Sequence, residues 1–360
     1  MVHGDERVDN YYWMREKSGP EVHAYLEAEN AYVDAVMEPT RGFQEKLYGE
    51  MLARIQETDL SVPYRKDGYF YYSRTEKGKQ YPIHCRKKGS LKSDEEVLLD
   101  LNEMAKGEKF LALGALEVSD DGNWLAYSVD NTGFRQYELR VKNLKTGKPG
   151  PEHIAKTVSL AWAADNQTLF YSTEDAAKRP YRVYRHRLGS AEDALVYEER
   201  DEMFNVDLER TRSRQYLFLT TASLTTSEVR YLAAKRPAEE WKLVEARQPG
   251  QEYYLEHRGD HFYVRSNRAG RNFALFAAPV AEPDAKHWQE VVAHRDQVML
   301  EEMTFFQNYS VLREREDGLV RLRVTDLRNG QSHRIEFPEP AYSAGFDENR
   351  EFDTSVLRYN

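Results

Sequence analysis

The sequence predicts an all-β fold, a seven-bladed β-propeller whose last blade is incomplete, preceded by an α-helical N-terminal segment. Three observations lead to this prediction. Apolar residues recur at helical spacing only within the first 60 residues. From Ser61 onward, strand-like runs rich in Tyr, Phe, Val, Leu and Thr alternate with turns such as Asp-Gly and Asn-Gly. These runs repeat with a period near that of a propeller blade. We therefore expect two regions, an N-terminal helical segment over residues 1-60 and a propeller over residues 61-360.

The N-terminal segment is predicted to hold two amphipathic helices. Pro20 suits a first helical position, and apolar residues recur at helical spacing as far as Met37. Pro39 ends this helix, and Thr40 can cap a second one that carries the apolar stripe of Phe43, Leu47, Met51, Leu52 and Ile55. Two such helices need an apolar partner, which is either each other and their own domain or another domain.

The β region repeats one pattern, an aromatic or aliphatic strand that ends in Ser, Thr or another polar residue. The last position of this strand in each repeat is Ser73, Ser128, Ser172, Thr220, Val264, Leu312 and Leu357. Successive copies lie 55, 44, 48, 44, 48 and 45 residues apart. Such spacing is typical of four-stranded propeller blades, since each blade is one repeat that packs on its neighbours.

The seven predicted blades differ in completeness. We place them near 64-90, 112-150, 157-195, 204-245, 251-292, 300-336 and 341-360. The seventh unit reaches Asn360 in the middle of its second strand, as expected for a fragment of a longer protein. Because an incomplete blade leaves strand edges exposed, we expect lower stability than the length suggests and a tendency to self-associate.

Composition excludes several classes of protein. The 360 residues include 51 Lys and Arg against 61 Asp and Glu, a net charge of −10 that argues against nucleic acid as a partner. The single cysteine, Cys85, allows no internal disulfide. The longest apolar run, residues 273-281, is too short to cross a membrane, and residues 1-7 do not resemble a signal peptide. We expect a soluble, cytoplasmic protein that does not bind membranes.

The sequence offers no catalytic nucleophile, metal site or cofactor site. The G-x-S-x-G turn of serine hydrolases is missing, and Ser343 lacks the first glycine of that motif. His257 and His261 flank a turn, but without a third ligand nearby we interpret them as partly exposed strand residues. His84 and Cys85 do not have a zinc spacing, and Cys85 is expected to be a packed small residue.

Two further local patterns have structural explanations. The run from Ser119 to Trp124 resembles the Asp-containing turns of sialidases, but the pattern does not recur in every blade. We predict a turn in which an acidic side chain caps backbone N–H groups. Arg86, Lys87 and Lys88 form a short basic run, which we expect to be a solvated hairpin turn.

Several strings resemble oligopeptidase B, a branch of the prolyl oligopeptidase family. The first is HGDERVDNYYWMR, residues 3-15. Others are ENAY at 29-32, PY at 63-64, YYSR at 71-74, GKQYP at 78-82, LDLNE at 99-103 and the blade around 119-130. The resemblance spans essentially the whole chain.

The resemblance implies a two-domain cytosolic serine peptidase, in which the propeller caps an α/β-hydrolase domain and admits only short peptides. It implies short basic peptides as substrates, cleaved after Arg or Lys, and a C-terminal hydrolase domain as the partner of the helical segment. Asp9, Tyr12, Trp13 and Arg15 are our candidates for contacts with that domain, the alternative being a packed N-terminal turn. The family's catalytic triad lies in the hydrolase domain, so we expect no catalytic residue and no activity in these 360 residues.

Two other functions remain open at this stage. A propeller scaffold of the WD40 kind would bind a protein partner, although the Trp-Asp signature is not repeated here. A propeller glycosidase would need paired carboxylates at the channel mouth. An arginyl peptide and an aryl glycoside, tested on the full-length protein, would separate the two enzyme classes.

Overall fold

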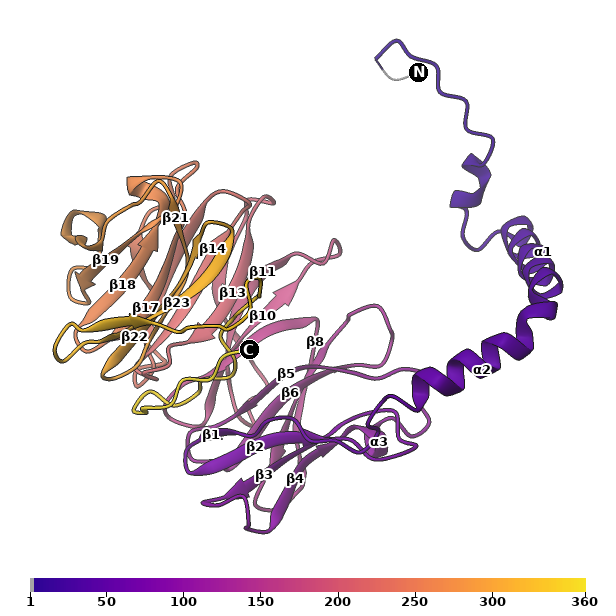
Figure 1. Cartoon of the computed structure of the whole chain (residues 1–360), viewed down its shortest axis with the longest axis horizontal. Coiled ribbons are helices and arrows are strands. Elements are labelled where there is room, and N and C mark those ends of the chain that lie inside the picture. Colours follow the sequence, from indigo (N-terminus) through magenta and orange to yellow (C-terminus); the bar gives the residue numbers. More distant parts are fainter. Residues whose placement is uncertain (1–2) are drawn as a thin grey trace. The chain divides into compact units, whose positions relative to one another are not determined.

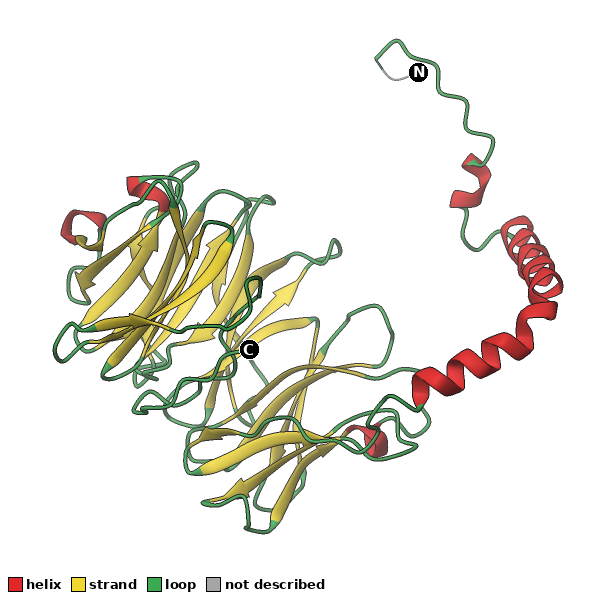
Figure 2. Ribbon diagram, in the orientation of Figure 1, coloured by secondary structure: helices red, strands yellow, loops and turns green. Residues whose placement is uncertain are grey.

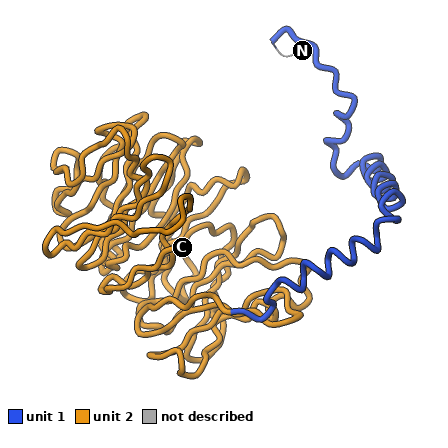
Figure 3. The backbone as a smooth tube through the Cα atoms, viewed as in Figure 1, with its two compact units in different colours: residues 1–59 blue, residues 60–360 orange. Residues whose placement is uncertain are grey.

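The computed structural model describes residues 3–360, which divide into two compact units (Figure 3). The first unit is Met1–Asp59 and the second is Leu60–Asn360. Each unit is described by itself below.

The N-terminal unit consists of helices (Figure 2). They are the 3-10 turn η1 (Tyr12–Arg15), α1 (Pro20–Met37), the 3-10 turn η2 (Glu38–Thr40) and α2 (Arg41–Leu52). The predicted helix from Pro20 to Met37 is confirmed, with proline in its first turn where no N–H is needed.

The predicted cap at Thr40 is wrong. Thr40 has helical backbone angles and its side chain caps no N–H group, because η2 joins α1 to α2 without an extended residue between them. Its hydroxyl instead donates to the Met37 carbonyl at 2.7 Å.

The second unit contains six four-stranded antiparallel sheets, the blades of a propeller (Figure 1). In each sheet the strands follow one another in sequence order, which short hairpin turns allow. The first three sheets are β1 (Tyr64–Lys66), β2 (Tyr69–Arg74), β3 (Ile83–Lys88), β4 (Glu95–Asp100); β5 (Ala112–Val118), β6 (Trp124–Asp130), β7 (Glu138–Asn143), β8 (Pro149–Ala155); and β9 (Thr157–Trp162), β10 (Thr168–Glu174), β11 (Pro180–Arg187), β12 (Ala194–Glu198). The last three are β13 (Asn205–Arg210), β14 (Tyr216–Ala222), β15 (Ser227–Ala233), β16 (Lys242–Glu245); β17 (Tyr253–Arg258), β18 (His261–Ser266), β19 (Ala274–Pro279), β20 (Gln289–Val292); and β21 (Val298–Phe305), β22 (Tyr309–Glu316), β23 (Leu319–Asp326), β24 (Ser332–Arg334). A short helix, α3 (Leu101–Met104), follows β4, and two 3-10 turns, η3 (Asn267–Ala269) and η4 (Ala285–His287), lie in the fifth sheet.

The core of this unit lies between neighbouring sheets. Leu139 of the second sheet packs with Trp162 of the third, and Phe170 of the third packs with Leu217 of the fourth. Equivalent clusters join the first sheet to the second, the fourth to the fifth and the fifth to the sixth. Because each sheet alternates side chains between two faces, each can contribute to both adjoining clusters. This packing confirms the predicted propeller.

The seventh unit is incomplete, as predicted, but the strand predicted over its last residues does not form. Residues 337–360, at the yellow end of the colour scale in Figure 1, contain only an isolated bridge between Phe346 and Tyr359. This segment packs Ala344 against the sixth sheet, and its Arg358 guanidinium donates to the Val62 carbonyl at 3.1 Å. The segment is held by such side-chain contacts and by a backbone hydrogen bond from the Gln307 N–H to the Phe352 carbonyl at 2.9 Å, not by a strand ladder.

Candidate functional site

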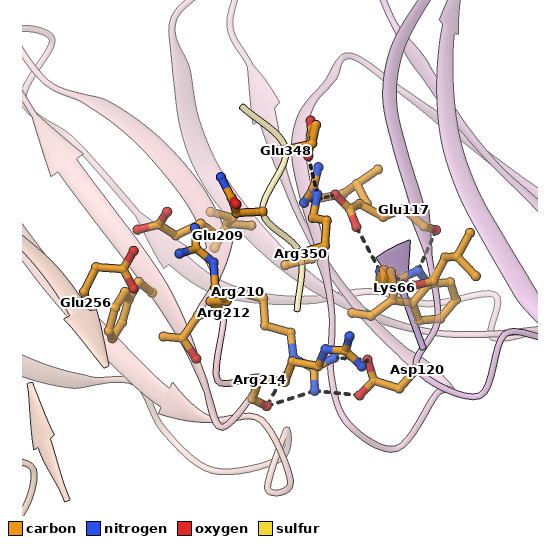
Figure 4. A pocket seen from close by; sticks show the side chains of 18 of the residues that line it. Lys66, Glu117, Asp120, Glu209, Arg210, Arg212, Arg214, Glu256, Glu348 and Arg350 are labelled. Atoms are coloured by element: carbon orange, nitrogen blue, oxygen red, sulfur yellow. Dashed lines mark hydrogen bonds and ion pairs between the residues drawn. The ribbon is translucent and has the colours of Figure 1, made fainter. Parts of the chain in front are cut away.

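The centre of the propeller holds a charged cavity of about 520 Å³ (Figure 4). It is lined by residues of the first strand of each of the first five sheets, and its charged lining residues are Lys66, Glu117, Asp120, Glu209, Arg210, Arg212, Arg214, Glu256, Asp347, Glu348 and Arg350. Strand alternation explains the placement. In β13, Val206 and Leu208 are buried in the core, so that Glu209 is exposed to the cavity.

Glu209 and Glu256 are the cavity carboxylates without an ion-pair partner among residues 3–360. Although water reaches the Glu209 side chain, the surrounding protein raises its pKa to about 8, and the Glu256 charge adds to the effect. Burial raises the pKa of Glu256 to about 7, against the opposing effect of Arg212. At neutral pH these raised pKa values favour the protonated, uncharged form of both side chains, whereas a cation that enters the cavity would favour the ionised form.

Ion pairs fill the opposite part of the cavity. The Lys66 ammonium lies 3.7 Å from Glu117, which also lies 3.3 Å from the Arg350 guanidinium. Burial lowers the pKa of Lys66. Arg350 pairs with Glu348 as well, at 2.6 Å. These contacts fix the residue 337–360 segment against the second sheet.

A second cavity of about 850 Å³ lies where the inner strands begin. Its lining combines four tyrosines, Tyr64, Tyr71, Tyr72 and Tyr137, with charged residues such as Glu174, and the Tyr64 and Tyr71 rings stack at 5.4 Å. The two cavities share several lining residues: Glu117, Leu160, Leu208, Glu348 and Arg350. The two cavities therefore adjoin, and we call them together the channel, whose charged end is the first cavity and whose aromatic end, named for its four tyrosines, is the second.

The candidate contact residues of the N-terminal unit lie in and before η1. The Arg15 guanidinium lies 4.7 Å from the centre of the Tyr12 ring, and Trp13 packs edge-on against Tyr25 at 5.7 Å. Asp9 accepts the Tyr11 N–H at 2.9 Å. All four candidate side chains retain solvent exposure within their unit, and their contact with a further domain stays a prediction.

Two sequence interpretations are wrong. Arg86 is not solvated but 3% exposed, and it forms two 2.8 Å hydrogen bonds to Glu96 and one to the Gly122 carbonyl. His257 is fully buried rather than partly exposed, with its Nδ1 2.7 Å from the Ser213 hydroxyl. Each residue has a polar partner that sequence alone does not reveal, which makes burial possible.

Other local predictions are confirmed. Asp121 accepts the Asn123 N–H at 3.0 Å and the Ser119 hydroxyl at 2.6 Å, as expected for a capped turn. Cys85 is buried, and burial raises the pKa of its thiol to about 11. Ser343 lies exposed in coil, outside any strand-turn-helix arrangement.

The described residues form neither a metal-binding cluster nor a membrane-spanning helix. Within residues 3–360, no three His, Cys, Asp or Glu side chains are grouped so that they could hold a metal ion. Over the same residues, no helix has the length and apolar character needed to span a membrane.

The residues that line the channel were not predicted from the sequence. The signal was present in ERTRSRQ, residues 209–215, where arginine occupies every second position at the end of an inner strand. Recognising it requires knowing which strand is innermost, and the repeat alone does not give this.

The six sheets and the channel define the second unit as a β-propeller domain. Residues 1–360 match the family described as "Prolyl oligopeptidase, N-terminal beta-propeller domain", and the chain belongs to this family. The parent family consists of serine peptidases, and these 360 residues comprise the propeller part without the catalytic domain.

Curated relatives and solved structures agree with this assignment. The chain is 39% identical to dipeptidyl aminopeptidase BI of Pseudoxanthomonas mexicana and 32% identical to protease 2 of Moraxella lacunata, covering 99% of this chain and 52% of each relative. It is similar to the structure of oligopeptidase B from Leishmania major, with a TM-score of 0.89 and 26% identity over 100% of this chain and 55% of that one. The chain is also similar to oligopeptidase B from Trypanosoma brucei with covalently bound antipain, with a TM-score of 0.89 and 28% identity over 100% of this chain and 55% of that one. The chain thus spans about half the length of the relatives it matches.

Proposed function

We propose that the chain is the propeller and N-terminal part of a cytoplasmic serine oligopeptidase that cleaves short peptides after Arg or Lys. The observation that carries the proposal is the likeness, over the whole chain, to two oligopeptidase B structures that match it at a TM-score of 0.89. In this proposal a hydrolase domain following residue 360 supplies the catalytic residues, and the propeller limits which substrates reach them.

The channel supports a preference for basic peptides. Glu209 and Glu256 present carboxylates to it without ion-pair partners among residues 3–360. A guanidinium or ammonium group of a peptide in the channel would lower these raised pKa values, and the carboxylates so formed would attract it more strongly in a confined site than in bulk water. The channel would therefore hold basic peptides near the active site.

The N-terminal unit supports the presence of a further domain. The apolar side chains Tyr12, Tyr32, Val33, Phe43 and Met51 are all exposed within this unit. Such a surface marks a contact with another protein part. We propose that α1, α2 and η1 pack on the hydrolase domain, with Asp9, Tyr12, Trp13 and Arg15 in that contact.

A second activity has specific support. The relative that is 39% identical is named dipeptidyl aminopeptidase BI, and that name describes removal of dipeptides from a free N-terminus. This activity would use the same propeller with a different position of the peptide. The family assignment favours either peptidase over a WD40-like scaffold or a glycosidase.

The test is to express the complete gene product and assay it with matched fluorogenic peptides. An N-blocked peptide ending in Arg or Lys, its Ala-ending counterpart and an unblocked dipeptide would each carry the same leaving group. Cleavage of the blocked basic peptide supports the oligopeptidase, and cleavage of only the unblocked dipeptide supports the aminopeptidase. No cleavage of any peptide by a folded protein would contradict both.

A further inference from the structure

The end of β13 and the hairpin turn that follows it carry three arginines at the charged end of the channel. Arg210 is the last residue of β13, Arg212 and Arg214 lie in the turn, and all three line the 520 Å³ cavity. The turn belongs to the fourth sheet, whose core packs on the third and fifth sheets. The side chains that its arginines bind belong to other sheets.

Two of the arginines reach the first and second sheets. The Arg210 guanidinium forms a two-pronged contact with Asp120, at 3.0 and 2.8 Å, in the turn between β5 and β6. Arg214 donates to Asp67, in the turn between β1 and β2, and lies 3.8 Å from Asp120 (Figure 4). Charge-assisted contacts of this two-pronged kind are strong and directional.

The third arginine reaches the sixth sheet. The Arg212 guanidinium donates to the Thr304 hydroxyl of β21 and lies 4.8 Å from the centre of the Phe306 ring. One turn therefore contacts the first, second and sixth sheets, none of which shares its core clusters. In a ring of blades, side chains that reach past the neighbouring blades must pass across the axis.

The turn is itself held in position. Arg210 also donates to the Arg214 carbonyl at 2.9 Å, and the Thr211 hydroxyl donates to the Tyr216 carbonyl at 3.1 Å. The Ser213 hydroxyl lies 2.7 Å from Nδ1 of buried His257 in the fifth sheet. The arginines therefore extend from a fixed base, and less side-chain entropy is lost when they bind the aspartates.

We propose that Arg210, Arg212 and Arg214 form an arginine latch that closes this end of the channel. Peptides would then reach the channel from its aromatic end. This second statement rests on the proposed function, whereas the latch itself does not. Because its contacts are mainly ionic and partly exposed, raised salt should loosen it.

The first experiment measures hydrogen exchange in the 360-residue chain. Asp67→Asn combined with Asp120→Asn keeps the side-chain shapes and removes both negative partners. We expect the amides of residues 211–215 to exchange about tenfold faster, in line with the loss of a partly buried ionic contact. The matched control is Glu239→Gln, which removes an exposed 3.0 Å ion pair with Arg236 in the loop between β15 and β16 of the same sheet. The latch would be overturned if the amides of residues 211–215 exchange at the parent's rate in the double variant and the melting temperature also equals that of the parent.

The second experiment uses the complete protein and concerns the route of entry. Cysteines replacing Asp67 and Arg214 would be joined by a cleavable bifunctional thiol reagent, which locks this end shut. We expect kcat/KM for an arginyl peptide to stay within about twofold of the unlocked variant, since peptides enter elsewhere. Activity that is lost on locking and restored on cleavage would show that peptides use this end. If the complete protein cleaves no peptide at all, the proposed function fails, and the exchange measurement still decides the latch.

Discussion

Apolar side chains are mostly buried in the propeller and mostly exposed in the helical unit. In the propeller, the sheets bury Leu125, Phe170 and Phe262 completely between them. Among residues 3–59, Val22 is the only buried one, although α1 and α2 carry many apolar residues. Since burial of apolar surface is the main source of stability, the propeller can hold itself together and the helical unit cannot do so to the same degree. The helical sequence is therefore better explained by an interface than by a core.

The largest difference in unfolding free energy between the units is expected when a charged side chain is removed. Glu314 in β22 is fully buried, and Arg323 binds it at 2.6 Å. Although burial would raise its pKa, hydrogen bonds from Arg323 and Arg295 keep the pKa lowered. Glu314→Ala leaves these arginines without their anion, and we expect a loss of about 3–5 kcal/mol in urea unfolding.

The matched control for Glu314 lies in the helical unit. Glu38 forms a 2.7 Å ion pair with Arg41, but both side chains are more than half exposed. Glu38→Ala should change the free energy of unfolding by about 0–1 kcal/mol. Equal losses at the two sites would contradict the contrast between the units.

The next contrast concerns leucines of the same size. Leu125 in β6 is 0% exposed and Leu47 in α2 is 44% exposed. Leu125→Ala should lower the free energy of unfolding by about 3 kcal/mol, because it leaves a cavity between the first two sheets. Leu47→Ala should have an effect of about 0.5 kcal/mol or less. Chemical denaturation followed by tryptophan fluorescence measures both, and a large loss for Leu47→Ala would reveal a core in the helical unit.

A smaller effect should depend on pH. The His186 imidazole is buried in β11, with its Nδ1 2.6 Å from Asp193 and its Nε2 3.6 Å from Glu152 of the second sheet. Burial alone would lower the pKa of His186, but the two carboxylates raise it above 6.5. The stabilisation is therefore fully present below the unfolded pKa, and it is lost as the pH rises through the higher folded pKa.

We expect the melting temperature to fall between about pH 6 and about pH 8 through this group. His186→Gln should flatten that part of the profile, whereas His23→Gln, at an exposed position of α1, should leave it as in the parent chain. A His186→Gln profile that keeps the parent slope would exclude this histidine as its cause.

The smallest effect on stability is expected at the candidate interdomain residues. Trp13→Ala should change the unfolding free energy of the 360-residue chain by about 0.5 kcal/mol or less, since the side chain contacts mainly Tyr25 within its own unit. In the complete protein the same substitution should lower the melting temperature if η1 packs on the hydrolase domain. A melting temperature unchanged in both proteins would remove Trp13 from the proposed contact.

Sequence reasoning gave the architecture because each blade repeats the same strand pattern, and a spacing near 45 residues between Ser128, Ser172 and later copies reflects one four-stranded sheet. It failed where a residue depends on a distant partner. Arg86 belongs to a basic run that we predicted to be solvated, but its hydrogen bonds to Glu96 and the Gly122 carbonyl allow it to be buried. The channel carboxylate Glu209 likewise becomes visible only when the strands are arranged around an axis. The local sequence pattern therefore predicts the helices and strands, whereas the site depends on contacts between blades.

The measurement that tests the contrast between the units most directly is hydrogen exchange along the whole 360-residue chain, read by mass spectrometry. We predict that the amides of Trp124–Asp130 in β6 exchange only through global unfolding, whereas those of Pro20–Met37 and Arg41–Leu52 exchange through local opening and much faster. Helical amides as slow as those of β6 in a monomeric sample would contradict the account, because the helical unit would then possess a core of its own.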